Sequence, residues 1–171
     1  MIGVAPTTST TASLALCDAL AVTLMQHKDF QKEDFQNFHP GGKLGSQLIR
    51  VDALMHTGTT LPLLDEGQNM GDGLLLMTEK GFGIAGIVDQ ANILTGVITD
   101  GDLRRNMQGL LEKTVSDVAT PNPKSIPTGT LASEALKIMN DAKVGAVFVI
   151  NTENIPVGIL HIHDCIRAGI V

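Results

Sequence analysis

The sequence predicts an α/β (α+β) protein whose larger part consists of two similar half-domains, each with the element order βαββα. Three observations support this prediction. A ten-residue phrase, GVITDGDLRR at 96–105, returns as GILHIHDCIR at 158–167. Segments with helix and strand patterns precede the phrase in the same order both times. The composition is 43% hydrophobic and 18% charged, which is typical of a chain with a buried core.

A constant offset of 62 residues aligns the two copies and relates Asp102 to Asp164. Each copy begins with a lead-in, VDALMHTG or VSDVATPN, and continues with a helix whose apolar residues follow the i, i+3, i+4 spacing. A strand, an Asn-containing turn and a second strand come next and predict a hairpin, which a last helix follows. The first helix and first hairpin strand of each copy are expected at 71–81, 83–89, 132–145 and 146–151.

The repeated phrase combines groups that suit a phosphorylated ligand. Thr99 stands at the end of a buried strand, where a hydroxyl and the free backbone N–H groups of a helix start can bind phosphate. Asp102 can accept hydrogen bonds from ribose hydroxyls, and Arg104 and Arg105 add positive charge. The alternative is that Asp100 or Asp102 only caps the helix. Because the aspartate is present in both copies, we favour a ligand cleft.

The phrase resembles the glycine, apolar, apolar, Ser/Thr, x, x, Asp pattern of CBS domains, which occur in pairs. This resemblance implies a tandem CBS pair with a cleft between its halves. Gly96, Thr99 and Asp102 match the pattern fully, and in the family such residues contact adenosine nucleotides or related ligands. Thr57 and Asp117 lie in the lead-ins that fold over such clefts, and they are included as candidate ligand contacts.

The second copy departs from the family pattern. Gly158 and Asp164 are present, but His161 stands where Ser or Thr is expected. We therefore expect the two clefts to differ, with the second taking another ligand or none. Alternation along a strand would put His161 and His163 on one face, where a metal ion is conceivable. The usual ligand spacings are missing, so no metal is predicted.

Residues 1–46 belong to neither copy. The segment from 2 to 30 is read as a strand end, a Thr/Ser-rich turn and then a helix with almost no polar face. A helix that is apolar all round is expected to be buried. Little in this chain could cover it except a second copy, so the segment is interpreted as one end of a larger domain.

Six segments in order, APTTSTT, DALAV, EDFQNFHPGGKLG, LMHTG, GVITDGDLRR and HIHDCIRAGIV, resemble the back half of the arabinose-5-phosphate isomerase family. That family joins a sugar isomerase (SIS) domain to a CBS pair. The resemblance implies a C-terminal SIS remnant at 1–46, a first CBS domain at 47–110 and a second at 111–171. The family interconverts D-ribulose 5-phosphate and D-arabinose 5-phosphate for the synthesis of Kdo in lipopolysaccharide. Its end product CMP-Kdo, or a nucleotide, is the effector expected in the CBS pair.

The resemblance also implies a catalytic role for His39, which matches the functional histidine of the family's HPGG segment. Aldose–ketose isomerisation needs an acid/base pair near neutral pH, and the family's other functional groups lie upstream of the residues matched here. We therefore expect the chain alone to be inactive and to require no cofactor. Three alternatives stay open: His39 completes a site in a partner, His39 is only a loop residue, or the pair is an oligomerisation module.

Composition excludes some classes of partner. The net charge of −6 and the pI near 5.2 argue against nucleic-acid binding, as does the lack of Trp and Tyr. No uninterrupted apolar run reaches the roughly 18 residues of a membrane span. The two cysteines, Cys17 and Cys165, form no CxxC motif and suggest a reducing compartment. We expect a cytoplasmic protein that self-associates as a dimer or tetramer.

Overall fold

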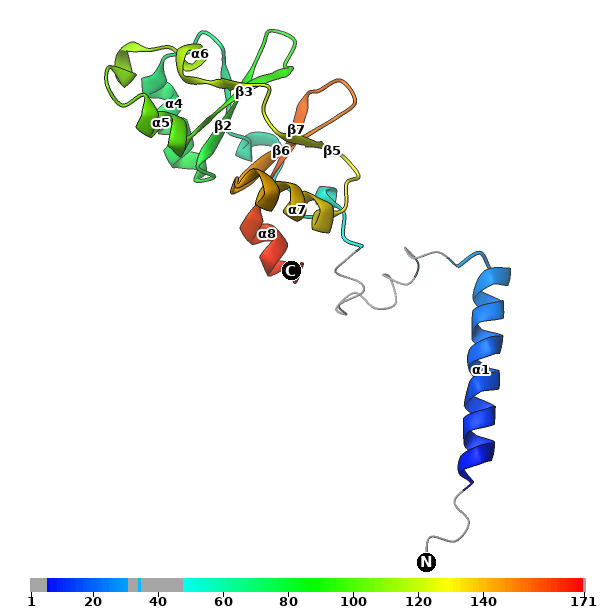
Figure 1. Ribbon diagram of the computed structural model, residues 1–171. Helices are drawn as coiled ribbons and strands as arrows, with labels where there is room; N and C mark the ends of the chain where they lie inside the picture. The colour runs from blue at the N-terminus through cyan, green and yellow to red at the C-terminus, as the bar shows by residue number, and fades with distance from the viewer. Residues whose placement is uncertain (1–5, 31–33, 35–47, 171) are drawn as a thin grey trace, which may run out of the picture. The chain divides into compact units, whose positions relative to one another are not determined.

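The computed structural model describes residues 6–30, 34 and 48–170, and it divides into two compact units (Figure 1). The first unit is Met1–Gly45 and the second is Ser46–Val171. The predicted catalytic residue His39 lies outside the described residues.

The first unit contains helix α1, Thr7–His27, which begins directly after Pro6. The Thr/Ser-rich stretch predicted as a turn is helical, and the hydroxyls of Ser9 and Thr10 each donate to the Pro6 carbonyl at 3.0 Å. None of its residues is buried, contrary to the expectation for a helix this apolar. The large apolar side chains that it exposes are Leu14, Leu16, Leu20, Val22, Leu24 and Met25.

Helix α1 is also long and apolar enough to cross a membrane, by length and composition only. Hydroxyl side chains and one aspartate interrupt its apolar residues, so it contains no long uninterrupted apolar run. Its mean hydropathy is nevertheless 1.3. Core helices of soluble proteins and signal sequences satisfy the same test, so the finding by itself assigns no location.

The second unit has the predicted order βαββα in each of its halves. The first half contains β1 (Leu63–Asp65), α4 (Met70–Lys80), β2 (Ile84–Val88), β3 (Leu94–Thr99) and α5 (Asp100–Arg105). The second contains β5 (Ser125–Pro127), α7 (Ala132–Ala142), β6 (Ala146–Ile150), β7 (Pro156–His161) and α8 (Ile162–Arg167). Helix α7 ends before the predicted residue 145, because Lys143 adopts a left-handed conformation at its C-cap.

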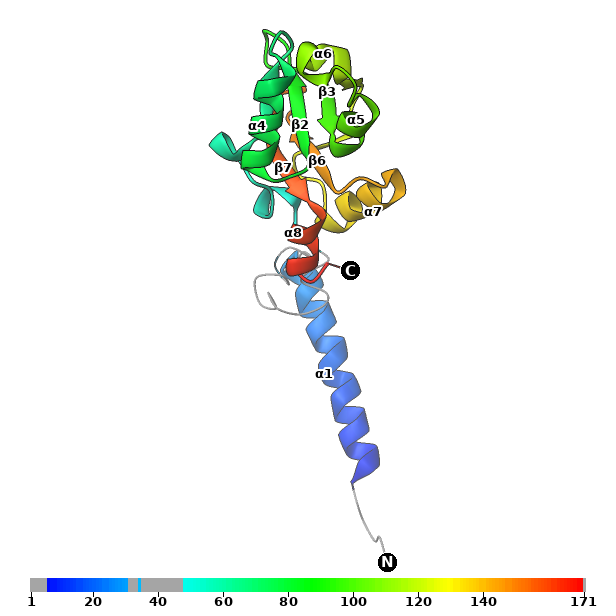
Figure 2. The ribbon, with the colours of Figure 1, turned by 90° about the vertical axis from the view of Figure 1, so that its left-hand side faces the viewer.

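The two sheets repeat the same pairing. In each, the first strand is parallel to the second, and the second forms an antiparallel hairpin with the third. Asn92 and Asn154 take the positive φ of the hairpin turns, and each donates its N–H to the carbonyl three residues earlier. The sheets, of order β1-β2-β3-β4 and β5-β6-β7, lie next to each other with their helices outside (Figures 1 and 2).

The lead-ins of the two halves are exchanged. The first lead-in, expected at 51–58, corresponds in the structure to residues 48–57. It contains the 3-10 turn η1 (Val51–Ala53) and packs on the second half. Val51 is fully buried in that core, and its N–H donates to the Thr130 carbonyl at 2.9 Å. The 3-10 turn η2 (Gly58–Thr60) follows this lead-in.

The second lead-in, expected at 115–122, corresponds in the structure to residues 112–121 and packs on the first half in the same way. It starts at the end of η3 (Leu110–Glu112) and contains α6 (Val115–Val118) and β4 (Thr120–Pro121). Val115 is buried in the core of the first half, and its N–H donates to the Gln68 carbonyl at 2.9 Å. Strand β4 then adds to the sheet beside β3.

A third buried cluster joins the halves. It contains Ile84, Val97, Ala146, Phe148 and Ile159, which come from strands β2, β3, β6 and β7. The offset of 62 relates Ile84 to Ala146 and Val97 to Ile159, so this interface is close to symmetric.

Candidate ligand cleft

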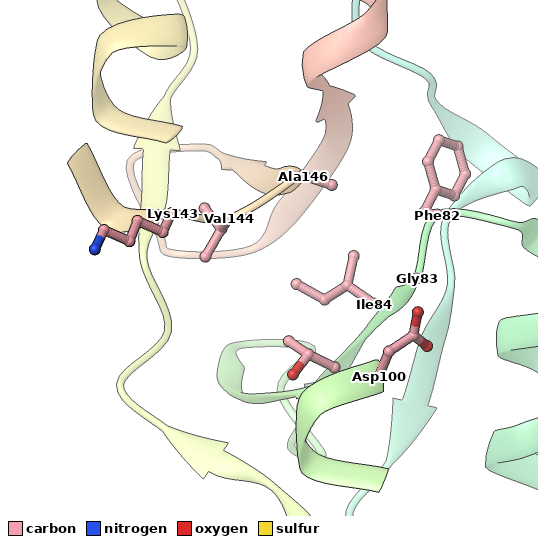
Figure 3. A pocket seen from close by; sticks show the side chains of 9 residues that line it. Phe82, Gly83, Ile84, Asp100, Lys143, Val144 and Ala146 are labelled. Atoms are coloured by element: carbon pink, nitrogen blue, oxygen red, sulfur yellow. The ribbon is translucent and has the colours of Figure 1, made fainter. Parts of the chain in front are cut away.

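A cleft of about 270 Å³ lies between the halves (Figure 3). One wall is 82–84 together with Thr99 and Asp100, and the other is 143–146. The loops 82–84 and 144–146 are equivalent under the offset of 62, so corresponding backbone segments face each other. Thr99 is the predicted site residue that this cleft contains.

The chemistry of the cleft is mixed. Ile84, Val144 and Ala146 supply an apolar floor, while the Asp100 carboxylate lies beside Gly83 (Figure 3). The exposed Lys143 stands at the rim, and its ammonium group points away from the centre in this view. A ligand with an apolar ring, hydroxyl groups and an anionic end matches these surfaces.

Asp102 is buried and is the third residue of α5, where it forms a capping box with the N-cap residue Thr99. Its Oδ2 accepts from the Thr99 N–H at 2.8 Å and from the Thr99 hydroxyl at 2.6 Å, while the Asp102 N–H donates back to that hydroxyl at 3.3 Å. This is the reciprocal bonding of a capping box. The helix-cap alternative is therefore the geometry that the structure shows at this residue.

The second oxygen of Asp102 is also occupied. Oδ1 accepts from Arg105 at 2.5 Å and from the hydroxyl of Thr120, which belongs to the second lead-in, at 3.0 Å. Burial alone would raise the pKa of Asp102, but the hydrogen bonds from Thr99, Thr120 and Arg105 together outweigh it and hold that pKa below the ordinary value. Through Thr120, Asp102 thus links the second lead-in to the repeated segment 96–105.

Asp164 has the same role in the second copy. Its Oδ2 accepts from the His161 N–H at 3.0 Å and lies 3.1 Å from Nε2 of His56, which belongs to the first lead-in. Arg167 approaches its Oδ1 at 3.8 Å. The Nδ1 of His161 accepts from the His163 N–H at 3.1 Å and so caps α8.

The two clusters correspond position by position, but their chemistry differs. The offset of 62 relates Thr99 to His161 and Arg105 to Arg167. Thr120 and His56 are equivalent through their pairing, opposite Val97 and Ile159 respectively. The two threonines near Asp102 are thus replaced by two histidines near Asp164.

The glycines of the phrase permit close approach of the lead-ins. A Cβ on Gly96 would lie 3.3 Å from the Thr120 carbonyl oxygen, and one on Gly158 would lie 2.8 Å from Cγ of Met55. Gly96 also lines a separate hollow of about 260 Å³ beside the second lead-in. In this structure both glycines contact protein segments, and the candidate cleft lies elsewhere.

The other predicted contacts lie apart from the cleft. Arg104 is exposed on α5, Thr57 is exposed before η2, and Asp117 is exposed and caps α6 with Thr114. Hydrogen bonds from the Thr114 hydroxyl and N–H lower the pKa of Asp117. Sequence reasoning missed Lys143 as a lining residue and Thr120 as a partner of Asp102.

Within 6–30, 34 and 48–170, no cluster of three His, Cys, Asp or Glu side chains has the geometry of a metal site. Cys165 is buried, which raises the pKa of its thiol. It packs in the core of the second half.

Paired βαββα half-domains with exchanged lead-ins define a class of tandem α/β modules. The CBS domain family matches residues 51–109 and 115–170, so the chain belongs to the CBS domain family. The tandem CBS pair expected from the repeated phrase is confirmed.

The chain is also similar to several known proteins. Arabinose 5-phosphate isomerase KdsD of Pseudomonas aeruginosa is 42% identical over 99% of this chain, and that of Escherichia coli K12 is 41% identical over the same share. The chain spans about half, 53%, of the length of these curated relatives. The CBSX2 structure in complex with AMP is 25% identical, with a TM-score of 0.62, over 70% of this chain and 95% of that one.

Proposed function

We propose that the CBS pair at 48–170 is the regulatory, ligand-binding part of an arabinose-5-phosphate isomerase that supplies Kdo for lipopolysaccharide. The single observation that carries the ligand-binding role is the cleft between the halves, which combines an apolar floor with Thr99, Asp100 and Lys143. The similarity to the KdsD enzymes across 99% of the chain supports the link to the isomerase. On this proposal the protein acts in the cytoplasm.

The proposed ligand is a nucleotide or the nucleotide sugar CMP-Kdo. The AMP complex of CBSX2 supports the first choice, because that protein has a similar fold. A base would lie on Ile84 and Val144, and hydroxyls would bond to Asp100 or Thr99. The long side chain of Lys143 would turn inward onto the anionic end.

Binding would regulate by favouring one arrangement of the two halves. The two walls of the cleft come from different halves, so a ligand that touches both stabilises the arrangement in which they face each other. A ligand hydroxyl that reached Asp102 would have to replace Thr120 or Arg105 there. Such a ligand would compete with the second lead-in and would loosen it, which is a second route from binding to conformation.

Calorimetric titration of the chain with AMP, ATP and CMP-Kdo tests the proposal. We expect saturable binding of at least one ligand and a loss of about ten-fold or more in affinity in Asp100→Asn or Lys143→Ala, because each removes a polar or charged contact. Asp65→Asn, at the end of β1 outside the cleft, is the matched control. Asp102→Ala tests the family's predicted contact, with circular dichroism to verify folding. Absence of heat with all three ligands would contradict the proposal.

We also propose that the chain by itself does not catalyse isomerisation. His39 alone supplies neither substrate orientation nor a second proton carrier. An assay with ribulose 5-phosphate is expected to give only the buffer rate. Turnover that disappears in His39→Ala would contradict this. Recovery of activity on mixing with a full-length enzyme that lacks the equivalent histidine would favour completion of a site in trans.

A second candidate function is self-association. The observation that favours it is the exposed apolar surface of α1, with Leu14 and Leu16 each more than 60% exposed. Sedimentation of the chain over a range of concentrations is expected to show dimers or tetramers. A monomer at every concentration would exclude this role.

A further inference from the structure

Only one of the two lead-in contacts contains a side chain that ordinarily titrates near neutral pH. In the first copy the Thr120 hydroxyl donates to Asp102, and hydroxyl groups do not titrate near neutral pH. In the second copy Nε2 of His56 lies 3.1 Å from Oδ2 of Asp164. Imidazole is the side chain that ordinarily gains and loses its proton between pH 5 and 8.

The His56 contact is part of the attachment of the first lead-in. The backbone of His56 exchanges two hydrogen bonds with Ile159, in both directions at 2.9 Å. Its ring contacts Phe82 edge-on at 5.1 Å between centroids, and the neighbouring Met55 packs on Gly158. A change of charge on His56 is therefore expected to change how tightly the first lead-in is bound to β7.

We propose that the His56–Asp164 pair is an acid-closed latch. When His56 takes up a proton, its hydrogen bond to Asp164 becomes an ion pair, and the first lead-in is held more tightly on the second half. The lead-in is the stretch through which the preceding residues continue into the CBS pair. The latch thus makes the hold on that stretch depend on pH, and it does so whether or not the pair binds a nucleotide.

The groups around the latch decide its working range. His161 on β7 interacts electrostatically with His56 and Asp164, and with His163 and Arg167 of α8. Arg167 also lies 3.8 Å from Oδ1 of Asp164. Burial, and then the neighbouring His163, lower the pKa of His161 below 6.5. The ring of His161 therefore stays neutral at pH values where an ordinary imidazole is charged, and it adds no repulsion against His56.

Below about pH 6.5, acidification is expected to lower the stability of the fold. Because the pKa of His161 is lower in the folded chain than in the unfolded one, folding disfavours its protonation, and stability falls as pH falls below about 6.5. A proton on Nδ1 of His161 would also end its bond from the His163 N–H. The latch is consequently tested between pH 8.0 and 6.5.

Hydrogen exchange on the full chain measures the latch directly, with rates corrected for intrinsic exchange at each pH. We expect the protection of the His56 and Ile159 amides to rise about two- to five-fold from pH 8.0 to 6.5, the size of a partly exposed ion pair. The amides of the β3–β4 pair, which the Thr120 contact fastens, should show no such rise. Unchanged protection at His56 and Ile159 would overturn the proposal.

Two variants separate the latch from a general effect of pH. His56→Thr installs the residue type of the first copy and should abolish the rise, while His27→Thr on α1 is the matched control and should keep it. In Asp164→Asn the rise should also be lost, because the neutral amide cannot form an ion pair with a protonated His56. A rise retained in His56→Thr or in Asp164→Asn would contradict the latch.

Discussion

Gly86 and Phe148 occupy equivalent positions in the two halves, 62 residues apart. The Phe148 ring packs directly against Gly86. Phe148 is fully buried in the cluster between the sheets, and a Cβ on Gly86 would lie 2.8 Å from its Cζ. We expect Gly86→Ala to lower the free energy of unfolding by about 1–3 kcal/mol, because the packed ring has little room to move. Urea unfolding measures the change.

Two further variants make this prediction specific. Gly67→Ala places a Cβ in open space and should change stability by less than about 0.5 kcal/mol. Adding Phe148→Leu to Gly86→Ala should cost less than the sum of the two single changes, since the smaller side chain relieves the overlap. Additive costs would mean that Gly86 is constrained by something other than Phe148.

Some contacts of single residues could be predicted from the sequence, and others could not. The offset of 62 related Asp102 to Asp164 and Thr99 to His161, and the local pattern offered a helix cap only at Asp100 or Asp102. In the structure Thr99 and His161 are the N-cap residues of α5 and α8, and each bonds within one helical turn to its aspartate. The offset did not predict Thr120 or His56 as partners of the aspartates. These two are 64 positions apart, not 62, and they reach the aspartates through long-range pairing that no local pattern encodes.

Among the elements, the exchanged lead-ins are the feature with the clearest consequence for stability. Val51 comes before the first half in sequence but is buried in the core of the second, and Val115 shows the reverse. Truncation of either side chain removes two buried carbon groups, so we expect Val51→Ala and Val115→Ala each to cost about 2 kcal/mol.

The part of the molecule that each substitution destabilises is a stronger test of the exchanged lead-ins than the size of the stability loss. Native-state hydrogen exchange should show faster opening around β5 and α7 in Val51→Ala, and around β1 and α4 in Val115→Ala. The two variants are matched controls for each other. Opening confined to the half that adjoins the mutated residue in sequence would contradict the exchange.

Helices and strands were predictable to within a few residues where apolar spacing was regular, as at α4 and β2. The C-terminal end of α7 was not, because Lys143 adopts a left-handed conformation that is usual for glycine. Nor did the spacing in the lead-ins predict which half they would cover. An apolar stripe indicates that a face is buried, but it does not identify the surface that buries it.

The whole molecule consists of a CBS pair with its own cores and a separate N-terminal unit. All buried residues of the three clusters lie between 51 and 170. We expect a chain that begins at Ser46 to keep the midpoint of guanidinium unfolding of the full chain, as followed by circular dichroism. A markedly lower midpoint would mean that residues 1–45 stabilise the pair.

The exchanged lead-ins also constrain how the chain is made. During synthesis the first lead-in emerges from the ribosome before any strand of the half that it covers. Its apolar residues must stay uncovered until translation has passed α8, whereas the first half can close once residue 121 is free. The order of synthesis thus leaves the first lead-in as the last piece to dock, and chaperones that bind exposed apolar segments would meet it there.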